Sequence, residues 1–206
     1  MKPILRGHFH EAMFYITLGA CLMLIARTES STELWATIAY TLGTLTMFGI
    51  SALYHRITWS PKSRALMRKL DHCGIYIMIA ATFTPVTLLA LSPESGRTLF
   101  ISIWTVAVLG ILQSIFFINL PKWVSAILYL IAGYMILPYV PELGAKLSTS
   151  HLWLLIGGGI VYSLGALAYG LKKPVLSPKY FGYHEVFHVL VSIAAIMHFL
   201  VVYSLV

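Results

Sequence analysis

A chain of 206 residues that is 59% hydrophobic and only 10% charged cannot cover a water-facing surface, because soluble domains carry about 25% charged residues. The net charge of +7 comes from 14 Lys and Arg residues against 7 Asp and Glu residues. The basic residues lie between apolar runs and not on one aromatic-rich surface, which argues against a nucleic-acid-binding protein. The expected partners are membrane lipids, whose anionic headgroups explain the basic excess.

Seven apolar segments follow one another along the chain, most of them close to the length of about 20 residues that crosses a hydrocarbon core of about 30 Å. They cover residues 12–26, 34–54, 72–91, 98–118, 123–140, 152–171 and 184–206. The first could be a signal peptide, but no small-residue cleavage site follows it, so we interpret it as a retained helix. The Gly157-Gly158-Gly159 run predicts close helix packing. The sequence therefore predicts an all-α bundle of seven transmembrane helices that forms one domain over residues 1–206.

Basic residues are shared unevenly between the two sides of this bundle. If the N-terminus is cytoplasmic, eleven of the 14 Lys and Arg residues lie in inner segments, beginning with Lys2 and Arg6. The outer loops then hold three, namely Arg27, Arg97 and Lys146. Because Lys and Arg collect in cytoplasmic loops, the N-terminus is expected inside the cell and the C-terminus outside.

Polar residues gather at the cytoplasmic ends of three predicted helices. Ser51 and His55 end the second apolar segment, Asp71 precedes the third, and His184 and His188 begin the seventh. Ionisable residues inside a membrane are costly and indicate functional sites. Within each helix, Ser51 and His55, and likewise His184 and His188, are four residues apart and share one face. These five residues are therefore expected to meet at one depth of the membrane.

Two histidines one helical turn apart can bind one metal ion, and His55 from a facing helix would complete three nitrogen ligands with His184 and His188. Three protein ligands and one open position form the arrangement of catalytic zinc, whose bound water has a pKa near about 7. Asp71 could then hydrogen-bond that water or act as a base towards it, and Ser51 could orient it or an oxyanion. The expected cofactor is therefore Zn²⁺.

Other histidines receive simpler interpretations. A single histidine at a helix end is usually an interfacial residue, so His8, His10 and His151 are interpreted as solvated residues in loops or at helix flanks. His72 points about 100° away from its neighbour Asp71 on a helix and is interpreted as structural.

The His184-Glu185-Val186-Phe187-His188 segment also matches the H-E-x-x-H pattern of zinc proteases, in which Glu185 would be the general base. A third ligand is expected six residues after the second histidine, where this chain has Ala194. His198 lies about 15 Å further along a straight helix and cannot share the same ion. A membrane metalloprotease remains the lesser alternative.

Together these residues resemble the hemolysin III family, the bacterial branch of the progestin and adiponectin receptor superfamily. The resemblance rests on Ser51-Ala52-Leu53-Tyr54-His55-Arg56, Leu70-Asp71-His72, Ile79-Ala80-Ala81-Thr82-Phe83-Thr84-Pro85, His184-Glu185-Val186-Phe187-His188 and His198-Phe199. It implies a seven-helix protein of the bacterial cytoplasmic membrane, with zinc held by His55, His184 and His188 near the cytoplasmic face and with Ser51 and Asp71 beside it.

The superfamily is similar to alkaline ceramidases, so the resemblance implies hydrolysis of a lipid amide or ester. Its receptor branch carries Gln at the position of Glu185, which argues against Glu185 as an essential base. The family pattern in the first span is incomplete here, with Glu11 as its nearest remnant. The alternative is a non-enzymatic protein, either a pore-forming cytolysin or a sensor of the lipid state that uses zinc structurally.

Overall fold

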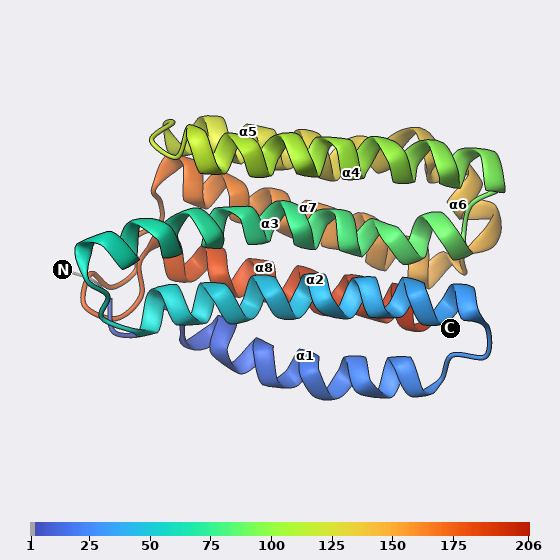
Figure 1. Ribbon diagram of the computed structural model, residues 1–206, viewed down its shortest axis with the longest axis horizontal. Helices are drawn as coiled ribbons and strands as arrows, with labels where there is room; N and C mark the ends of the chain where they lie inside the picture. Colours follow the sequence, from blue (N-terminus) through green and yellow to red (C-terminus); the bar gives the residue numbers. More distant parts are fainter. Residues whose placement is uncertain (1–2) are drawn as a thin grey trace.

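The structure, a computed structural model, describes residues 3–206 as an almost entirely helical bundle (Figure 1). Lys2, which was counted among the inner basic residues, lies outside the described residues. The helices are α1 (His8–Ala26), α2 (Ser31–Arg56), α3 (Pro61–Leu89), α4 (Pro93–Phe116), α5 (Lys122–Gly133), the 3₁₀-helix η1 (Tyr134–Tyr139), α6 (Val140–Lys146), α7 (Thr149–Leu171) and α8 (Tyr183–Tyr203).

Seven helical stretches in this part of the chain are long and apolar enough to cross a membrane. Six are α1, α2, α3, α4, α7 and α8, and the seventh is the continuous run Lys122–Lys146, which joins α5, η1 and α6. Large apolar side chains on their outer faces, such as Trp35, Phe116 and Trp153, are exposed. Exposure of this kind suits lipid and not water. The prediction of an all-α, seven-helix, multi-pass membrane protein is confirmed.

Several helices begin at serine caps. The Ser30 hydroxyl accepts the Glu33 N–H, and the Glu33 carboxylate accepts the Ser30 N–H. Ser60 and Ser92 each cap a helix whose first residue is proline, Pro61 or Pro93. Serine satisfies otherwise unpaired N–H groups there, and proline has no N–H to leave unpaired.

The helices differ from the apolar segments at several ends. The first begins at His8 instead of residue 12, and the third begins at Pro61 instead of residue 72. Consequently Lys62 and Lys69, expected in a loop, lie on the first turns of α3. The fifth span changes from α-helix to 3₁₀-helix after Gly133, before Pro138. The apolar pattern marks only the part of a helix that suits the interior of the membrane, whereas caps and prolines set where the helix begins and ends.

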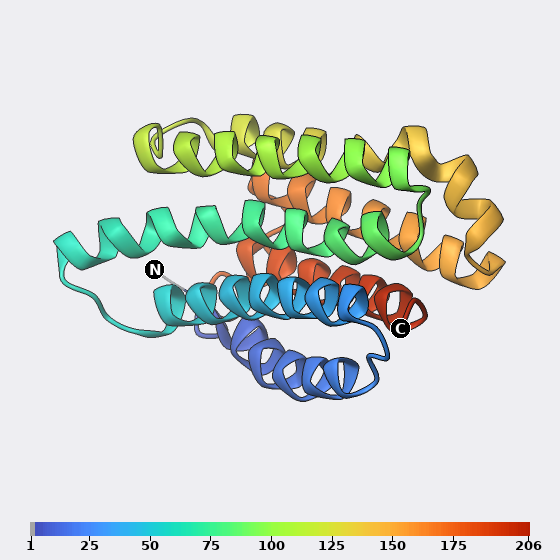
Figure 2. The ribbon, with the colours of Figure 1, turned by 45° about the vertical axis from the view of Figure 1, so that its right-hand side comes forward.

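Figures 1 and 2 show two layers of helices, α4, α3, α2 and α1 in order in one, and α5, α7 and α8 in the other. The start of α1 and the end of α8 lie at opposite ends of the bundle (Figure 1). One core cluster joins α3, α4 and α5 around Tyr76 and Ile103, and another joins α1, α2, α3 and α8 around Phe48 and Val191.

Helices α7 and α8 approach each other closely at Gly158. A methyl group at that position would lie 2.4 Å from ring atoms of His198. The close packing predicted from the glycine run is therefore confirmed at Gly158, and it brings the backbone of α7 against the C-terminal half of α8.

Candidate metal centre

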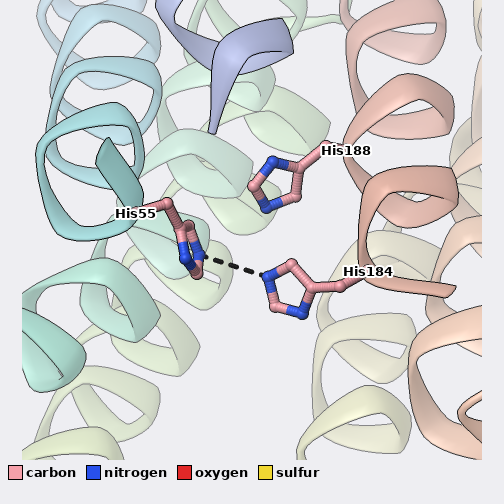
Figure 3. A group of neighbouring side chains, drawn as sticks. All are labelled: His55, His184 and His188. Carbon is pink, nitrogen blue, oxygen red and sulfur yellow. Dashed lines mark hydrogen bonds between the residues drawn. The ribbon is translucent and has the colours of Figure 1, made fainter. Parts of the chain in front are cut away.

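Three buried histidines from two helices face one another near the end of the bundle where α1 begins (Figure 3). His55 lies at the end of α2, and His184 and His188 lie on the first turns of α8. One ligand atom from each lies within 4.8 Å of the other two. The Nε2 atoms of His55 and His184 are 3.2 Å apart. The structure thus brings together the three histidines that the sequence singled out.

Their ring nitrogens fit a metal ion. Both nitrogens of His188 and Nδ1 of His184 are buried without a hydrogen-bond partner among the described residues. Leaving a buried polar atom unpaired costs about 1–3 kcal/mol, which coordination would recover. Tetrahedral zinc with Zn–N bonds of about 2.0–2.1 Å places its nitrogens about 3.3 Å apart, close to the 3.2 Å between His55 and His184. Three imidazoles suit zinc and other transition metals.

Asp71 and Ser51 lie beside the three histidines, as the sequence predicted. Asp71 is on α3, with one carboxylate oxygen 3.8 Å from Nε2 of His55. Ser51 is buried one helical turn before His55. Both line a cavity that His184 and His188 also line. A carboxylate and a hydroxyl therefore reach the space next to the proposed ligands without belonging to the group of three.

His10 was interpreted as solvated, and this interpretation is wrong. Its side chain is buried, with 2% exposed. The ring stacks on His188, with centroids 3.8 Å apart and planes 6° apart, and a hydrogen bond of 2.8 Å joins Nδ1 to Oγ of Ser51. Because α1 begins at His8, His10 lies on its buried stripe with Met13, Thr17, Cys21 and Leu24.

The remaining histidines have other contacts. His8 also lies on α1, not in a loop, and its Nε2 is 2.6 Å from the Arg56 guanidinium. His151 is half-buried, and its Nδ1 is 2.8 Å from the Ser148 hydroxyl. His72 donates from Nδ1 to the Arg68 carbonyl, 2.9 Å away, one turn back on its own helix.

Glu185 is fully buried, and its carboxylate contacts other groups than the neighbouring histidines do. One carboxylate oxygen pairs with the Arg6 guanidinium, and the other accepts the Gly182 N–H at 2.8 Å. The carboxylate thus ties the N-terminal segment to the start of α8. His198, the other histidine on that helix, donates from Nε2 to the Leu155 carbonyl at 3.0 Å. These contacts disfavour the protease alternative, which needs Glu185 as a base.

The chain before α1 covers this end of the bundle. The Ile4 N–H donates to the Lys179 carbonyl in the α7–α8 connection, 3.0 Å away. Gly7 then adopts a φ of +88°, and a Cβ atom there would lie 2.8 Å from Cβ of His55. Glycine is the residue that takes this conformation and this close approach without strain.

A cavity of about 220 Å³ extends from the histidines into the bundle. Its lining follows α3 from Asp71 to Val86, fifteen residues further on, a distance of about 22 Å along a helix. Away from the histidine end the lining is mainly apolar. Tyr134, Leu137 and Ile160, which are 42%, 56% and 53% exposed, also line it. The cavity therefore joins the histidine cluster to the outer surface of the bundle between η1 and α7.

Comparison with known proteins agrees with the resemblance seen in the sequence. The family described as "Haemolysin-III related" matches residues 1–199. This chain belongs to the haemolysin III family. It is 35% identical over 161 residues to "Hemolysin-3" of Bacillus cereus, covering 77% of this chain and 73% of that protein. It is 32% identical over 167 residues to "Hemolysin-3 homolog" of Bacillus subtilis (strain 168), covering 80% and 78%.

A more distant relative belongs to the same superfamily. The "Adiponectin receptor protein" of Drosophila melanogaster is 27% identical over 204 residues, covering 88% of this chain and 46% of the receptor. The match therefore covers most of this chain and about half of the receptor, which has the longer sequence.

Proposed function

We propose that this protein binds a zinc ion through His55, His184 and His188 and hydrolyses an amide or ester bond of a membrane lipid. The observation that carries the proposal is the cavity, which leads from the histidine cluster to the lipid-facing surface. An enclosed histidine cluster with no such path would instead suit a metal with a purely structural role. The family relationship supports the metal, because the chain and an adiponectin receptor share a superfamily, and resemblance to it implies zinc held by these three histidines.

The shape of the cavity supports a lipid substrate. Its polar end holds Ser51, Asp71 and the histidines, and its apolar part extends about 22 Å along α3. A long acyl chain would bury its methylene groups there, each worth about 0.8 kcal/mol. The linkage to the headgroup would then lie at the polar end.

The residues around the histidines have the chemistry that such a reaction needs. His55, His184 and His188 would hold the zinc ion, which would supply activation of water and polarisation of a carbonyl group. Asp71 accepts the proton that the attacking water loses as its oxygen bonds to the carbonyl carbon. Ser51 donates a hydrogen bond to the oxygen that gains negative charge. The carbon–nitrogen or carbon–oxygen bond then breaks, and the amine or alcohol leaves with the proton.

The proposed orientation has the N-terminus in the cytoplasm and the C-terminus outside. The end of the bundle with the histidines also carries Arg6, Arg56, Lys62 and Lys179. Basic residues favour the cytoplasmic side, so the metal centre would lie near the inner leaflet.

The proposal is tested with purified protein in lipid nanodiscs, given acyl-chain-labelled amide and ester lipids. We expect release of free fatty acid that a strong chelator abolishes and added zinc restores. His188→Ala should remove this activity together with the zinc, and His198→Ala should keep the zinc. A wild-type protein that holds zinc but releases no fatty acid from any amide or ester lipid would contradict the enzymatic proposal and favour a pore or a lipid sensor.

A further inference from the structure

A fourth histidine packs against the proposed ligands from a helix that contributes none of them. His10, on α1, contacts α8 through its ring and α2 through its Nδ1 atom. It is the only polar residue besides Thr17 on the buried stripe of this helix. Burying an imidazole in a lipid-embedded bundle is costly, so its contacts at this point require an explanation.

The geometry excludes His10 as a further ligand. A metal ion bound to an imidazole nitrogen lies in the plane of that ring. The rings of His10 and His188 lie one above the other, with centroids 3.8 Å apart and planes 6° apart. An ion in the plane of His188 therefore lies well out of the plane of His10, and one ion cannot satisfy both. His10 is also absent from the group whose ligand atoms converge.

The same geometry suits a supporting role. A histidine ligand must hold its ring in one plane for its nitrogen to point at the metal, and hydrogen bonds from surrounding residues usually do this. His188 has no such hydrogen bond from the described residues to either nitrogen. The flat face of His10 covers one side of its ring instead. The hydrogen bond to Ser51 in turn keeps the His10 ring from rotating.

We propose that His10 is a positioning residue for the metal centre, which holds the imidazole plane of His188 by stacking and fixes the Ser51 hydroxyl by hydrogen bonding. This inference rests on the proposed metal site. It makes α1 part of the centre, because one side chain of α1 connects the metal-binding helix α8 to the serine of α2.

Two apolar variants separate the stacking from the hydrogen bond. His10→Phe and His10→Leu both lose the hydrogen bond to Ser51, but only phenylalanine keeps a flat ring on His188. We expect zinc affinity, measured by chelator competition, to fall about tenfold in His10→Leu and to stay within about twofold of wild type in His10→Phe. The visible absorption bands of the cobalt-substituted protein should shift in His10→Leu and not in His10→Phe.

Ser51→Ala keeps the His10 ring and removes its hydrogen-bond partner, so it should weaken zinc binding less than His10→Leu does. His198→Ala, which removes a half-buried imidazole from the other half of α8, is the control and should leave affinity and spectrum unchanged. Equal affinities and spectra for His10→Leu and wild type would overturn the inference, as would a His10→Phe protein as weak as His10→Leu. A wild-type protein that binds no metal would overturn the metal site itself.

Discussion

Two histidines on α8 differ in what surrounds their ring nitrogens. His198 donates from Nε2 to the Leu155 carbonyl, and Gly158 leaves room for its ring against α7. His188, ten residues earlier, has neither nitrogen bonded among the described residues, and it faces His55 and His184. A half-buried histidine with a carbonyl partner holds two helices together. A buried histidine with no partner but two neighbouring imidazoles is arranged for a metal.

Removing His188 should have the largest effect on metal binding. His188→Ala takes away one of three proposed ligands, and we expect zinc affinity to fall by more than the 10- to 100-fold that loss of a residue supporting a ligand costs. His198→Ala should bind zinc as wild type does. Chelator competition with both purified variants makes the measurement. Wild-type zinc content in His188→Ala would contradict the assignment of His188, unlike His198, as a metal ligand.

The carboxylates of Asp71 and Glu185 should also differ, one being needed for lipid hydrolysis and the other not. Asp71→Asn keeps the shape of the side chain but removes the proposed base, so lipid hydrolysis should fall about 10²- to 10⁴-fold while zinc is retained. Glu185→Gln should keep most of the turnover per folded molecule, because Glu185 pairs with Arg6 and Gly182. Fatty-acid release and metal content measure both effects. The opposite ranking would restore the H-E-x-x-H mechanism.

Packing around His198 should affect stability and not metal binding. Gly158→Ala places a methyl group 2.4 Å from the His198 ring, so we expect a loss of about 1–3 kcal/mol in unfolding free energy. Gly159→Ala is the matched control, because nothing lies within 4 Å of that position. Thermal unfolding in detergent compares the two. A Gly158→Ala protein as stable as Gly159→Ala would mean that the helices are not in close contact there.

The orientation in the membrane has the smallest expected effect, because the cysteine variants that test it leave the structure and the metal site unchanged. A cysteine introduced near Lys146 should react with a membrane-impermeant maleimide added to intact cells, and one near Lys62 should not. The native Cys21 and Cys73 are buried and should stay unlabelled. Labelling near Lys62 alone would place the histidine end of α8 at the outer leaflet.

The place of these residues at the same end of the predicted spans, together with the i, i+4 spacing of His184 and His188 and of Ser51 and His55, was enough to predict that they meet. His10 was missed because an apolar count starts the first span at residue 12. The stripe of His10, Met13, Thr17, Cys21 and Leu24 was the available signal.

The start of α3 and the cavity show two different limits of sequence reasoning. Ser60 and Pro61 form a recognisable cap, so the early start of α3 could have been predicted from them. The cavity could not, because it depends on how the side chains of α2, α3, α5, α7 and α8 pack together. No periodicity within one helix records such a space.

The metal content of the wild-type protein tests the central claim most directly. The protein is purified without chelators or a histidine tag, dialysed against metal-free buffer, and measured by inductively coupled plasma mass spectrometry before and after incubation with zinc. We expect about one zinc per chain, because His55, His184 and His188 form one group of three ligands. A protein that holds no zinc above the buffer level, even after incubation, would contradict the account.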